Sequence, residues 1–268
     1  MSRTLEGKTV VLTGATGGIG RSIATRLNAA GARLLLVGRN PERLRALAES
    51  LGSSRHIAVP ADLGSDAGRR EVRAACDSAA GGIDLLINCA GTNNFGMFED
   101  QPQNAIKQVL DINLTGPILL SLELMPLLRQ RGDAHIVNIG STFGSIGYPG
   151  FSAYCASKFG LRGFTEALRR ELGDSGIRVS YVAPRATRTD LNDDSIVAMN
   201  AALGTAMDEP GLVADEVMTV VTGRAAPMRY IGWPEKLFVR INALFPGLVD
   251  NSLRKQLPVI RRFASSKP

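Results

Sequence analysis

The sequence predicts an α/β fold in a single domain. Short apolar runs rich in β-branched residues alternate with helical stretches, and a glycine-rich loop joins the first run to the first helix. The chain has 268 residues, 44% of them hydrophobic, and no long linker, repeat or low-complexity tract interrupts it. We expect this domain over residues 1–234 and a basic amphipathic extension, packed on or next to it, over residues 235–268.

Six strands and the helices between them can be placed in order. Each expected strand is an apolar run that ends at turn-forming or polar residues. The strands are expected at residues 8–13, 33–37, 56–61, 83–91, 135–141 and 177–184. The helices are expected at residues 18–32, 41–51, a polar stretch ending near Ala80, 103–131, and around Tyr154 and Lys158.

The loop GATGGIG after the first run predicts a phosphate site. Glycines 14, 18 and 20 permit a tight turn and a close approach of phosphate to the backbone. The helix that begins near Gly18 would direct its free N–H groups and positive dipole end at those phosphates. A glycine loop alone is a weak indication, but its position between a strand and a helix strengthens it.

Arg39 favours one of two dinucleotides. The second strand ends in Gly38-Arg39-Asn40, where an acidic residue would bond the ribose 2′-hydroxyl of NAD and an arginine would accept the 2′-phosphate of NADP. The acid is absent, and a guanidinium binds phosphate through paired hydrogen bonds, so we expect NADP(H) rather than NAD(H). A solvated loop arginine remains the alternative.

Tyr154 and Lys158 are four residues apart, so on a helix they share one face. A nearby cation favours the phenolate, so the pKa of Tyr154 is expected to fall from about 10 toward the working pH of a general acid/base. Ser141 ends a buried strand and would place its hydroxyl at the carboxyl edge of the sheet, where open α/β sheets bind ligands. By itself the pair also fits a helix surface with a solvated lysine.

With these segments in place, the sequence resembles a short-chain dehydrogenase/reductase (SDR) over residues 5–190. The family motif TGxxxGxG is found at residues 13–20, and the adenine-side aspartate is Asp62. The family's NNAG is Asn-Cys-Ala-Gly at residues 88–91, and its Asn-Ser-Tyr-Lys tetrad falls on Asn113, Ser141, Tyr154 and Lys158. Without the other motifs Asn113, a mid-helix asparagine, would be uninformative.

The resemblance implies a single Rossmann-like, doubly wound parallel β-sheet of about seven strands with NADP across its carboxyl edge. Tyr154 would exchange a proton with the substrate oxygen, Lys158 would lower the tyrosine pKa and bind ribose hydroxyls, Ser141 would bond the substrate carbonyl, and Asn113 would hold a proton-relay water. A homodimer through the long helices, or a homotetramer, is also implied. The implied cofactor contacts are Gly14, Thr16, Gly17, Gly18, Ile19, Gly20, Arg39, Asn40, Asp62, Leu63, Asn88, Ala90, Gly91, Tyr154, Lys158, Pro184, Thr187 and Thr189.

Two departures from the family pattern affect the substrate side. Pro184-Arg185 replaces the family's Pro-Gly, although Thr189-Asp190 keep the end of that motif. The Arg185 side chain could narrow the pocket, offer a cation to an acidic substrate, or point to solvent. The family's ending, a last strand that runs into a glycine pair, is missing.

Residues 190–210 fall where the family has its substrate lid. Apolar residues there suggest a lipophilic substrate, although they could equally serve only to pack the lid. The expected inner face consists of Ile196, Val197, Met199, Leu203 and Met207.

The tail combines helical apolar stripes with basic margins. Apolar residues follow helical spacing on both sides of Pro246-Gly247. Seven cations and two acids there contribute +5 of the formal net charge of +6. Such stripes suit an anionic membrane surface or an acidic partner such as an acyl carrier protein, or they dock on the body. The apolar residues are Leu237, Ile241, Leu244, Phe245, Leu248, Val249, Leu253 and Leu257, and the cations are Lys236, Arg240, Arg254, Lys255, Arg261, Arg262 and Lys267.

Composition argues against several other classes. The nearly neutral body disfavours nucleic-acid binding, and three cysteines with two histidines, in no ligand spacing, disfavour a disulfide framework or a metal site. Cys155 is expected to be a buried filler. No signal peptide and no charge-poor apolar segment of about 18 residues is expected, which predicts a cytoplasmic, at most peripherally membrane-associated protein.

The sequence therefore predicts an NADP-dependent oxidoreductase that acts on a lipophilic ketone or secondary alcohol. The favoured substrate is a 3-oxoacyl thioester of an acyl carrier protein or coenzyme A. A steroid or other lipid ketone at a membrane surface is the alternative, and a non-catalytic NADP-sensing or scaffold protein is the rival from another class.

Overall fold

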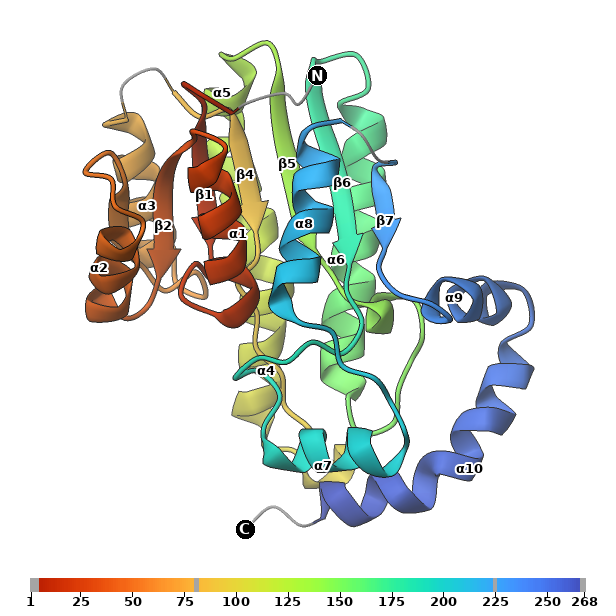
Figure 1. The fold of residues 1–268 in the computed structure, drawn as a ribbon. Helices are drawn as coiled ribbons and strands as arrows, with labels where there is room; N and C mark the ends of the chain where they lie inside the picture. The colour runs from red at the N-terminus through yellow and green to blue at the C-terminus, as the bar shows by residue number, and fades with distance from the viewer. Residues whose placement is uncertain (1–4, 80–81, 224–225, 266–268) are drawn as a thin grey trace.

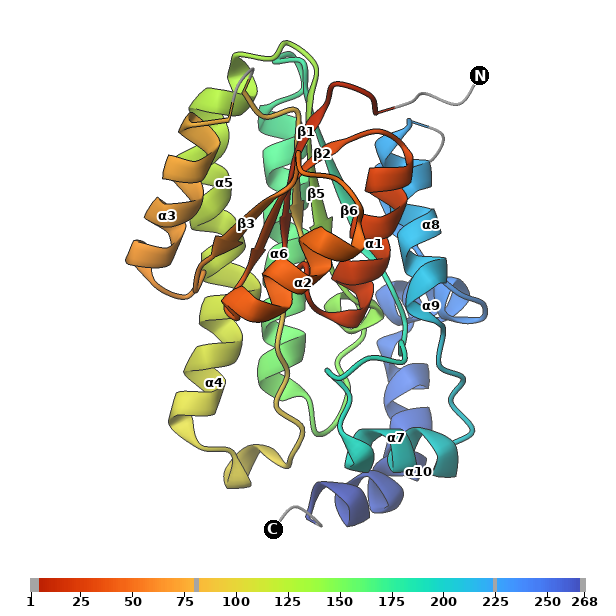
Figure 2. The ribbon, with the colours of Figure 1, turned by 60° about the vertical axis from the view of Figure 1, so that its left-hand side comes forward.

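A seven-stranded parallel sheet forms the centre of the molecule, with helices on both faces (Figures 1 and 2). The computed structural model describes residues 5–79, 82–223 and 226–265. The strand order is β3-β2-β1-β4-β5-β6-β7. The strands β2 and β3 are therefore added on one side of β1, and β4 to β7 on the other side. The strands are β1 (Thr9–Thr13), β2 (Arg33–Gly38), β3 (Ile57–Pro60), β4 (Leu85–Asn88), β5 (Ala134–Ile139), β6 (Ile177–Ala183) and β7 (Met228–Tyr230).

The helices form one layer on each face of the sheet and a smaller group beyond its carboxyl edge (Figure 2). Residues of α1, α2 and α8 share one core with the sheet, and residues of α3, α5 and α6 share the other. The helices are α1 (Gly18–Ala29), α2 (Pro41–Ser50), α3 (Asp66–Asp77), α4 (Gln103–Leu110), α5 (Gly116–Arg129), α6 (Ser152–Glu171), α7 (Asp194–Ala202), α8 (Pro210–Val221), α9 (Glu235–Leu244) and α10 (Pro246–Ala264).

The strands read as continuous apolar runs because both faces of the sheet are covered. In β1, Val10 and Leu12 belong to the core on one face and Val11 to the core on the other, and all three are fully buried. The α/β sheet and the six strands expected from these runs are confirmed, with ends that differ by a few residues. The polar helix expected to end near Ala80 ends at Asp77, and Ala80 lies outside the described residues.

The long helix expected at residues 103–131 is interrupted by a π-helical turn, Asp111–Thr115, between α4 and α5. The N–H of Gly116 bonds to the carbonyl of Asp111, five residues back, and Pro117 has no N–H to restore the normal pattern. A Cβ at Gly116 would lie 3.0 Å from the carbonyl oxygens of both Asp111 and Leu63, so the close packing of this turn favours glycine.

The same stretch corrects one expectation. Gln103–Arg129 is long and apolar enough to cross a membrane by length and composition, and it is the one such helix among the described residues. Leu120, Leu124 and Leu128 of α5 are nevertheless fully buried against the sheet. A core helix passes this test as readily as a membrane span does, so the match does not indicate a span.

The end of the chain keeps the last strand that the sequence seemed to lack. The strand β7, formed by Met228, Arg229 and Tyr230, pairs in parallel with β6. The segment before Gly232 is extended, although the glycine pair of the family pattern does not follow it. From there α9 projects beside the sheet, and α10 runs back beneath α7 (Figure 1). Ile260 and Ala264 of α10 share an apolar cluster with the lid, while Lys267 lies outside the described residues.

Candidate active site

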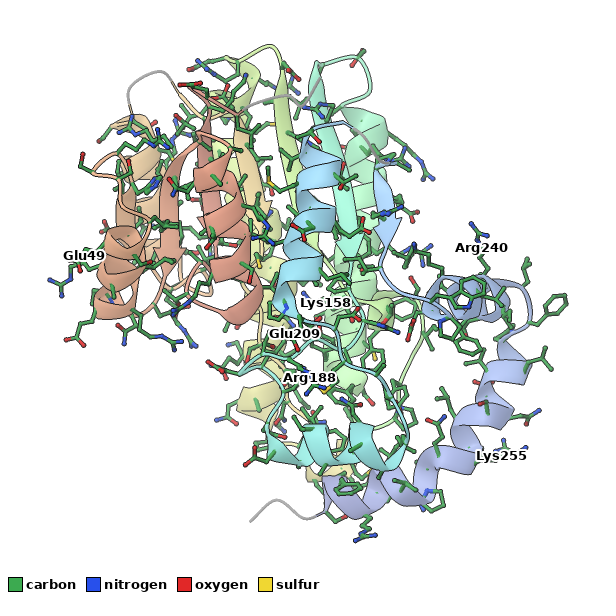
Figure 3. All side chains as sticks on the ribbon, in the orientation of Figure 1. Glu49, Lys158, Arg188, Glu209, Arg240 and Lys255 are labelled. Carbon is green, nitrogen blue, oxygen red and sulfur yellow. The ribbon has the colours of Figure 1, made fainter. Side chains whose placement is uncertain are left out.

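Most of the predicted site residues gather at the carboxyl edge of β1, β4, β5 and β6, around a cavity of about 440 Å³. The cavity extends from Arg39 at the end of β2 to the lid helix α7, with Lys158 in its wall. Figure 3 shows Lys158 between the sheet and α7. An opening at the strand-order reversal is where a doubly wound sheet binds its ligand.

The glycine loop is shaped by three close approaches. Gly14 has φ 65°, and a Cβ there would lie 2.7 Å from Cα of Ala90. A Cβ on Gly20 would overlap the Gly14 carbonyl oxygen, and one on Gly18 would lie 2.6 Å from Cγ2 of Thr189. Gly17 caps α1 without a side-chain hydrogen bond, so the N–H groups of the first turn are available to a ligand phosphate. These features fit a dinucleotide pyrophosphate.

Thr13 fixes the neighbouring turn. Its Oγ1 accepts hydrogen bonds from the N–H groups of Cys89 (2.9 Å) and Ala90 (3.0 Å). Thr13 entered the sequence-based expectations only as the first letter of a motif, and its position just before the glycine loop was the available signal. Ala90 and Gly91 consequently line the cavity.

Two expected contact residues have other partners. The amide of Asn88 donates to Asn138 Oδ1 (2.8 Å) and Ser121 Oγ (3.3 Å), and Asn88 is buried between strands rather than in the cavity wall. Asn40 Oδ1 accepts from the N–H of Arg43 (2.9 Å) and caps α2. Successive residues of a strand point to opposite faces of the sheet. The motif gives the residue types but not which face each one takes, so it could not indicate that the Asn88 side chain points away from the cavity.

Arg43 is a cavity residue that the sequence analysis missed. Arg39 and Arg43 both line the outer end of the cavity. Arg43 Nη2 donates to the Thr16 carbonyl (3.3 Å) and lies 3.7 Å from Asp190 Oδ2. Arg43 follows Arg39 by four residues, at the start of the expected helix. That position in the sequence could have indicated a second arginine near the same end of the cavity.

Tyr154 and Lys158 lie on one face of α6, as their spacing predicted. Lys158 is buried, its Nζ donates to the Ile139 carbonyl (3.0 Å), and it lies 5.7 Å from the centroid of the Tyr154 ring. Ser141 follows β5, and its Oγ accepts from the N–H of Phe143 (3.1 Å). The phenol, the hydroxyl and the ammonium therefore meet at one end of the cavity.

The expected fall in the pKa of Tyr154 does not occur in this structure. Burial raises the pKa of Tyr154 to about 12, and a hydrogen bond with Ser141 opposes that rise. Burial also lowers the pKa of Lys158 to about 8. The spacing predicted the neighbour but not the desolvation, which disfavours the charged form of both groups. Tyr154 is consequently a protonated phenol at neutral pH.

Asn113 lies in the π-helical turn and is fully buried. Its Oδ1 accepts from the Thr92 N–H (2.8 Å), and its Nδ2 donates to the Thr92 carbonyl (2.8 Å) and to Ser157 Oγ (3.1 Å). This side chain holds the loop after Gly91 against α6. It does not line the cavity.

Arg185 lies at the cavity wall but is neither solvated nor available as a cation for substrate. Its guanidinium bonds to both oxygens of Asp208 (2.7 and 2.9 Å) and to Glu235 (3.2 Å). The Arg185 side chain is 19% exposed and that of Asp208 7%. These carboxylates, from the lid segment and from α9, were not predicted because they are 23 and 50 residues away in the sequence.

The lid is the helix α7, capped by Asp193, whose Oδ1 accepts from the Ile196 N–H (3.0 Å). Ile196 and Met199 are buried and line the cavity, together with Asn200, which the apolar pattern could not identify. Val197 was expected on the inner face but is 40% exposed, because at roughly 100° per residue it points away from the helix face that Ile196 and Met199 bury. Leu203 packs partly buried against the same cluster.

An aromatic wall near Tyr154 was also missed. Phe143, Tyr148 and Phe151 pack around Tyr154, with ring centroids 4.8 Å apart for Phe143 and Tyr148 and 6.3 Å apart for Phe151 and Tyr154. Phe143 and Phe151 line the cavity. The density of aromatic residues between Ser141 and Tyr154 was the available signal.

Cys155 is buried next to this wall, and burial raises the pKa of its thiol, as suits a filler rather than a nucleophile. Over the described ranges, no three His, Cys, Asp or Glu side chains are grouped to hold a metal ion.

The fold and the site together define a Rossmann-type protein with a dinucleotide cavity and a Ser-Tyr-Lys group at one end. Comparison with known proteins identifies the family, since residues 8–199 match the short chain dehydrogenase model. The chain belongs to the short-chain dehydrogenase/reductase family. It is therefore an oxidoreductase that acts on CH–OH or carbonyl groups and uses a nicotinamide cofactor.

Similar proteins come from animals and bacteria. Dehydrogenase/reductase SDR family member 7B of Danio rerio is 31% identical over 261 residues, which cover 91% of this chain and 84% of that protein. Nodulation protein G of Rhizobium sp. (strain N33) is 38% identical over 208 residues, covering 75% and 83%. The crystal structure of a dehydrogenase/reductase from Sinorhizobium meliloti 1021 superimposes with a TM-score of 0.77 at 31% identity, covering 86% of this chain and 95% of that one.

Proposed function

We propose that this protein is an NADPH-dependent reductase of a lipophilic ketone, with Tyr154 as the proton donor. The observation that carries the proposal is that Tyr154, Ser141 and Lys158 meet at one end of the cavity, next to its apolar and aromatic lining. A phenol that retains its proton at neutral pH suits proton donation to a carbonyl oxygen as that oxygen gains negative charge.

The chain's own residues supply placement and proton transfer, and the nicotinamide cofactor supplies the hydride when bound. Ser141 Oγ, next to Tyr154, would hold the substrate carbonyl oxygen. Lys158, charged below its pKa of about 8, would support the proton loss of Tyr154 and bind ribose hydroxyls. Because the Asn113 side chain is occupied by Thr92 and Ser157, a relay water would have to bond to backbone groups of the π-helical turn.

The preference for NADPH rests on Arg39 and Arg43. Both side chains line the end of the cavity next to β2, where the family binds the adenosine ribose. No acidic residue follows β2 in the sequence before Glu42. Two guanidinium groups at this point favour a 2′-phosphate over a free hydroxyl.

The lipophilic substrate class rests on the apolar and aromatic lining near Tyr154. Phe143, Phe151, Ile196 and Met199 surround that end of the cavity. A 3-oxoacyl thioester of an acyl carrier protein or coenzyme A is the favoured substrate. A steroid or other lipid ketone is the alternative, because the same lining accepts a ring system. The cytoplasmic location and the homodimer or homotetramer remain predictions.

The test is NADPH oxidation with a medium-chain 3-oxoacyl thioester, measured beside a lipid ketone of similar size. Faster turnover of the thioester would support acyl-chain reduction, whereas preference for the ketone would support the alternative. Tight NADPH binding without turnover of either would contradict the reductase and favour the non-catalytic sensor.

A further inference from the structure

The first part of the tail carries a concentrated exposed apolar surface, here called the tail patch. Of the eleven large hydrophobic side chains exposed within the described residues, six lie between residues 233 and 248. Single exposed hydrophobics are ordinary, but a cluster of this kind marks a contact surface. The tail patch consists of Trp233, Leu237, Phe238, Leu244, Phe245 and Leu248, which are 41% to 72% exposed.

The patch faces away from the body. α9 docks through Val239, which is 8% exposed, and through Asn242, whose Nδ2 donates to the Ser145 carbonyl (2.9 Å). At roughly 100° per residue, Leu237 and Leu244 lie on the opposite side of the helix from Val239. The body therefore uses one face of α9 and leaves the apolar face to solvent.

Beyond Glu235, the two helices that carry most of the patch are rich in cations. Residues 236–264 hold six Lys or Arg residues and one acid, Asp250. Within the described structure none of the six forms an ion pair. Figure 3 shows Arg240 on α9 and Lys255 on α10 directed away from the body. The cations are Lys236, Arg240, Arg254, Lys255, Arg261 and Arg262.

We propose that the tail patch docks the protein on an anionic phospholipid surface. Apolar and aromatic side chains enter the headgroup boundary, and Trp is favoured there because its ring is apolar with one polar N–H. The cations of the same two helices, which form no ion pair in the described structure, bind anionic headgroups. A second copy would bring its own basic tail against this one, which opposes self-association. An acidic protein partner would use the cations but has no need for so large an aromatic area.

The docked surface lies close to the substrate cavity. Glu235 at the start of α9 pairs with Arg185 in the cavity wall, and Ile260 of α10 packs with Ile196 and Met199 of the lid. Docking would therefore bring the cavity close to a lipophilic substrate in the membrane. That benefit rests on the proposed function, whereas the docking itself does not.

Trp233 makes the docking directly measurable, because it is the single tryptophan of the chain. Its emission is recorded as vesicles of phosphatidylcholine, with or without phosphatidylglycerol, are added to the full chain without substrate. We expect a blue shift with the anionic vesicles, a much weaker one with the neutral vesicles, and loss of the difference in high salt.

Two variants and one control separate the contributions. Phe245→Ser with Leu248→Ser should weaken anionic-vesicle affinity by about tenfold or more, since both side chains are lost from the boundary. Arg254→Gln with Lys255→Gln, which leaves every apolar residue in place, should reduce the preference for anionic vesicles. The control, Leu212→Ser on α8, removes an exposed apolar side chain elsewhere and should bind as the parent does.

Three results would overturn the proposal. The first is a Trp233 emission that vesicles do not change, and the second is an equal response to neutral and anionic vesicles. The third is an emission that is already blue-shifted without lipid, in an oligomer that dissociates when Phe245→Ser and Leu248→Ser are introduced. The last would assign the patch to a second copy. Because no substrate is present, loss of the proposed reductase activity would not affect the outcome.

Discussion

At the scale of single residues, the chemistry depends on how burial changes the pKa of two neighbouring groups next to a serine hydroxyl. Tyr154 keeps its proton, Lys158 is a weaker base than a solvated lysine, and Ser141 contacts the phenol. The cavity is polar where these groups meet and apolar beyond them. Such an end can orient a carbonyl and supply its proton.

Tyr154→Phe removes the proton donor and keeps the ring. Turnover should fall by about a hundredfold to ten-thousandfold, the usual contribution of a general acid. NADPH affinity, measured by fluorescence titration, should change little. Turnover close to that of the parent would remove Tyr154 from its assigned role.

The pH dependence should report Lys158. The group is charged below its pKa of about 8 and loses its proton as the pH rises through that value. We therefore expect kcat/KM with NADPH, which reflects the free enzyme, to decline above about pH 8. A rate that stays level well above that pH would contradict a role for the charged lysine.

Cofactor preference should depend on Arg39 and Arg43. Replacing both with Ala should weaken NADPH binding by about tenfold or more, since charge-assisted hydrogen bonds to the phosphate are lost, and should leave NADH nearly unchanged. Arg45→Ala is the matched control, because Arg45 lies on the exposed side of α2, the helix that carries Arg43. Equal losses for NADPH and NADH would show that neither arginine reads the phosphate.

At the scale of secondary-structure elements, the tail is joined to the site. Arg185 connects the lid segment at Asp208 with α9 at Glu235. The carbonyl of Ser145, just after the Ser141 turn, accepts from Nδ2 of Asn242 on α9 (2.9 Å), and its hydroxyl bonds to Tyr230 of β7 (2.8 Å). Lid, tail and catalytic turn therefore share contacts that a separate extension would not have.

Arg185→Gly restores the family residue and tests that connection. It leaves the Asp208 carboxylate buried without its partner, so the free energy of unfolding should fall by about 2 kcal/mol. Denaturant unfolding measures the change, and limited proteolysis should show a more accessible lid.

Arg188→Ala is the control for this variant. It breaks the Arg188–Glu209 pair (3.1 Å), whose side chains are 61% and 73% exposed, near the same lid (Figure 3). Such a pair contributes roughly 0–1 kcal/mol. If the two variants unfold alike, the ion pairs of Arg185 do not hold the lid to the tail.

At the scale of the whole molecule, two apolar cores on opposite faces of the sheet hold the fold and enclose a few polar groups. His135 in β5 is one of them, 3% exposed, with Nε2 2.8 Å from Ser180 Oγ. Burial lowers its pKa from 6.5 to about 3. The folded protein thus holds a neutral imidazole over a range in which the unfolded chain is protonated.

Stability should consequently fall in acid because of His135. Above pH 6.5 both states are neutral and the group has no effect, whereas from 6.5 down to about 3 the unfolded chain binds the extra proton. Each pH unit in that window removes up to about 1.4 kcal/mol of unfolding free energy. His135→Asn should show a shallower decline below pH 6.5, and parallel curves for parent and variant would contradict this account.

The sequence by itself determined the first six strands and their order in the chain, the glycine loop and the pairing of Tyr154 with Lys158. Each is a local pattern, since apolar runs, glycine spacing and a four-residue separation act through neighbours in the chain. The placement of Ser141 at the carboxyl edge followed from the same reasoning.

Only the tertiary structure decided the protonation of Tyr154, the partners of Arg185 and the directions of Asn88 and Val197. Desolvation depends on everything packed around a group, and the carboxylates that bind Arg185 come from distant segments. The exposed tail patch was equally undecided, because a helical stripe shows that one face is apolar but not whether the body covers it. Local spacing fixes which side chains are neighbours, and the three-dimensional packing fixes how each is charged and what it contacts.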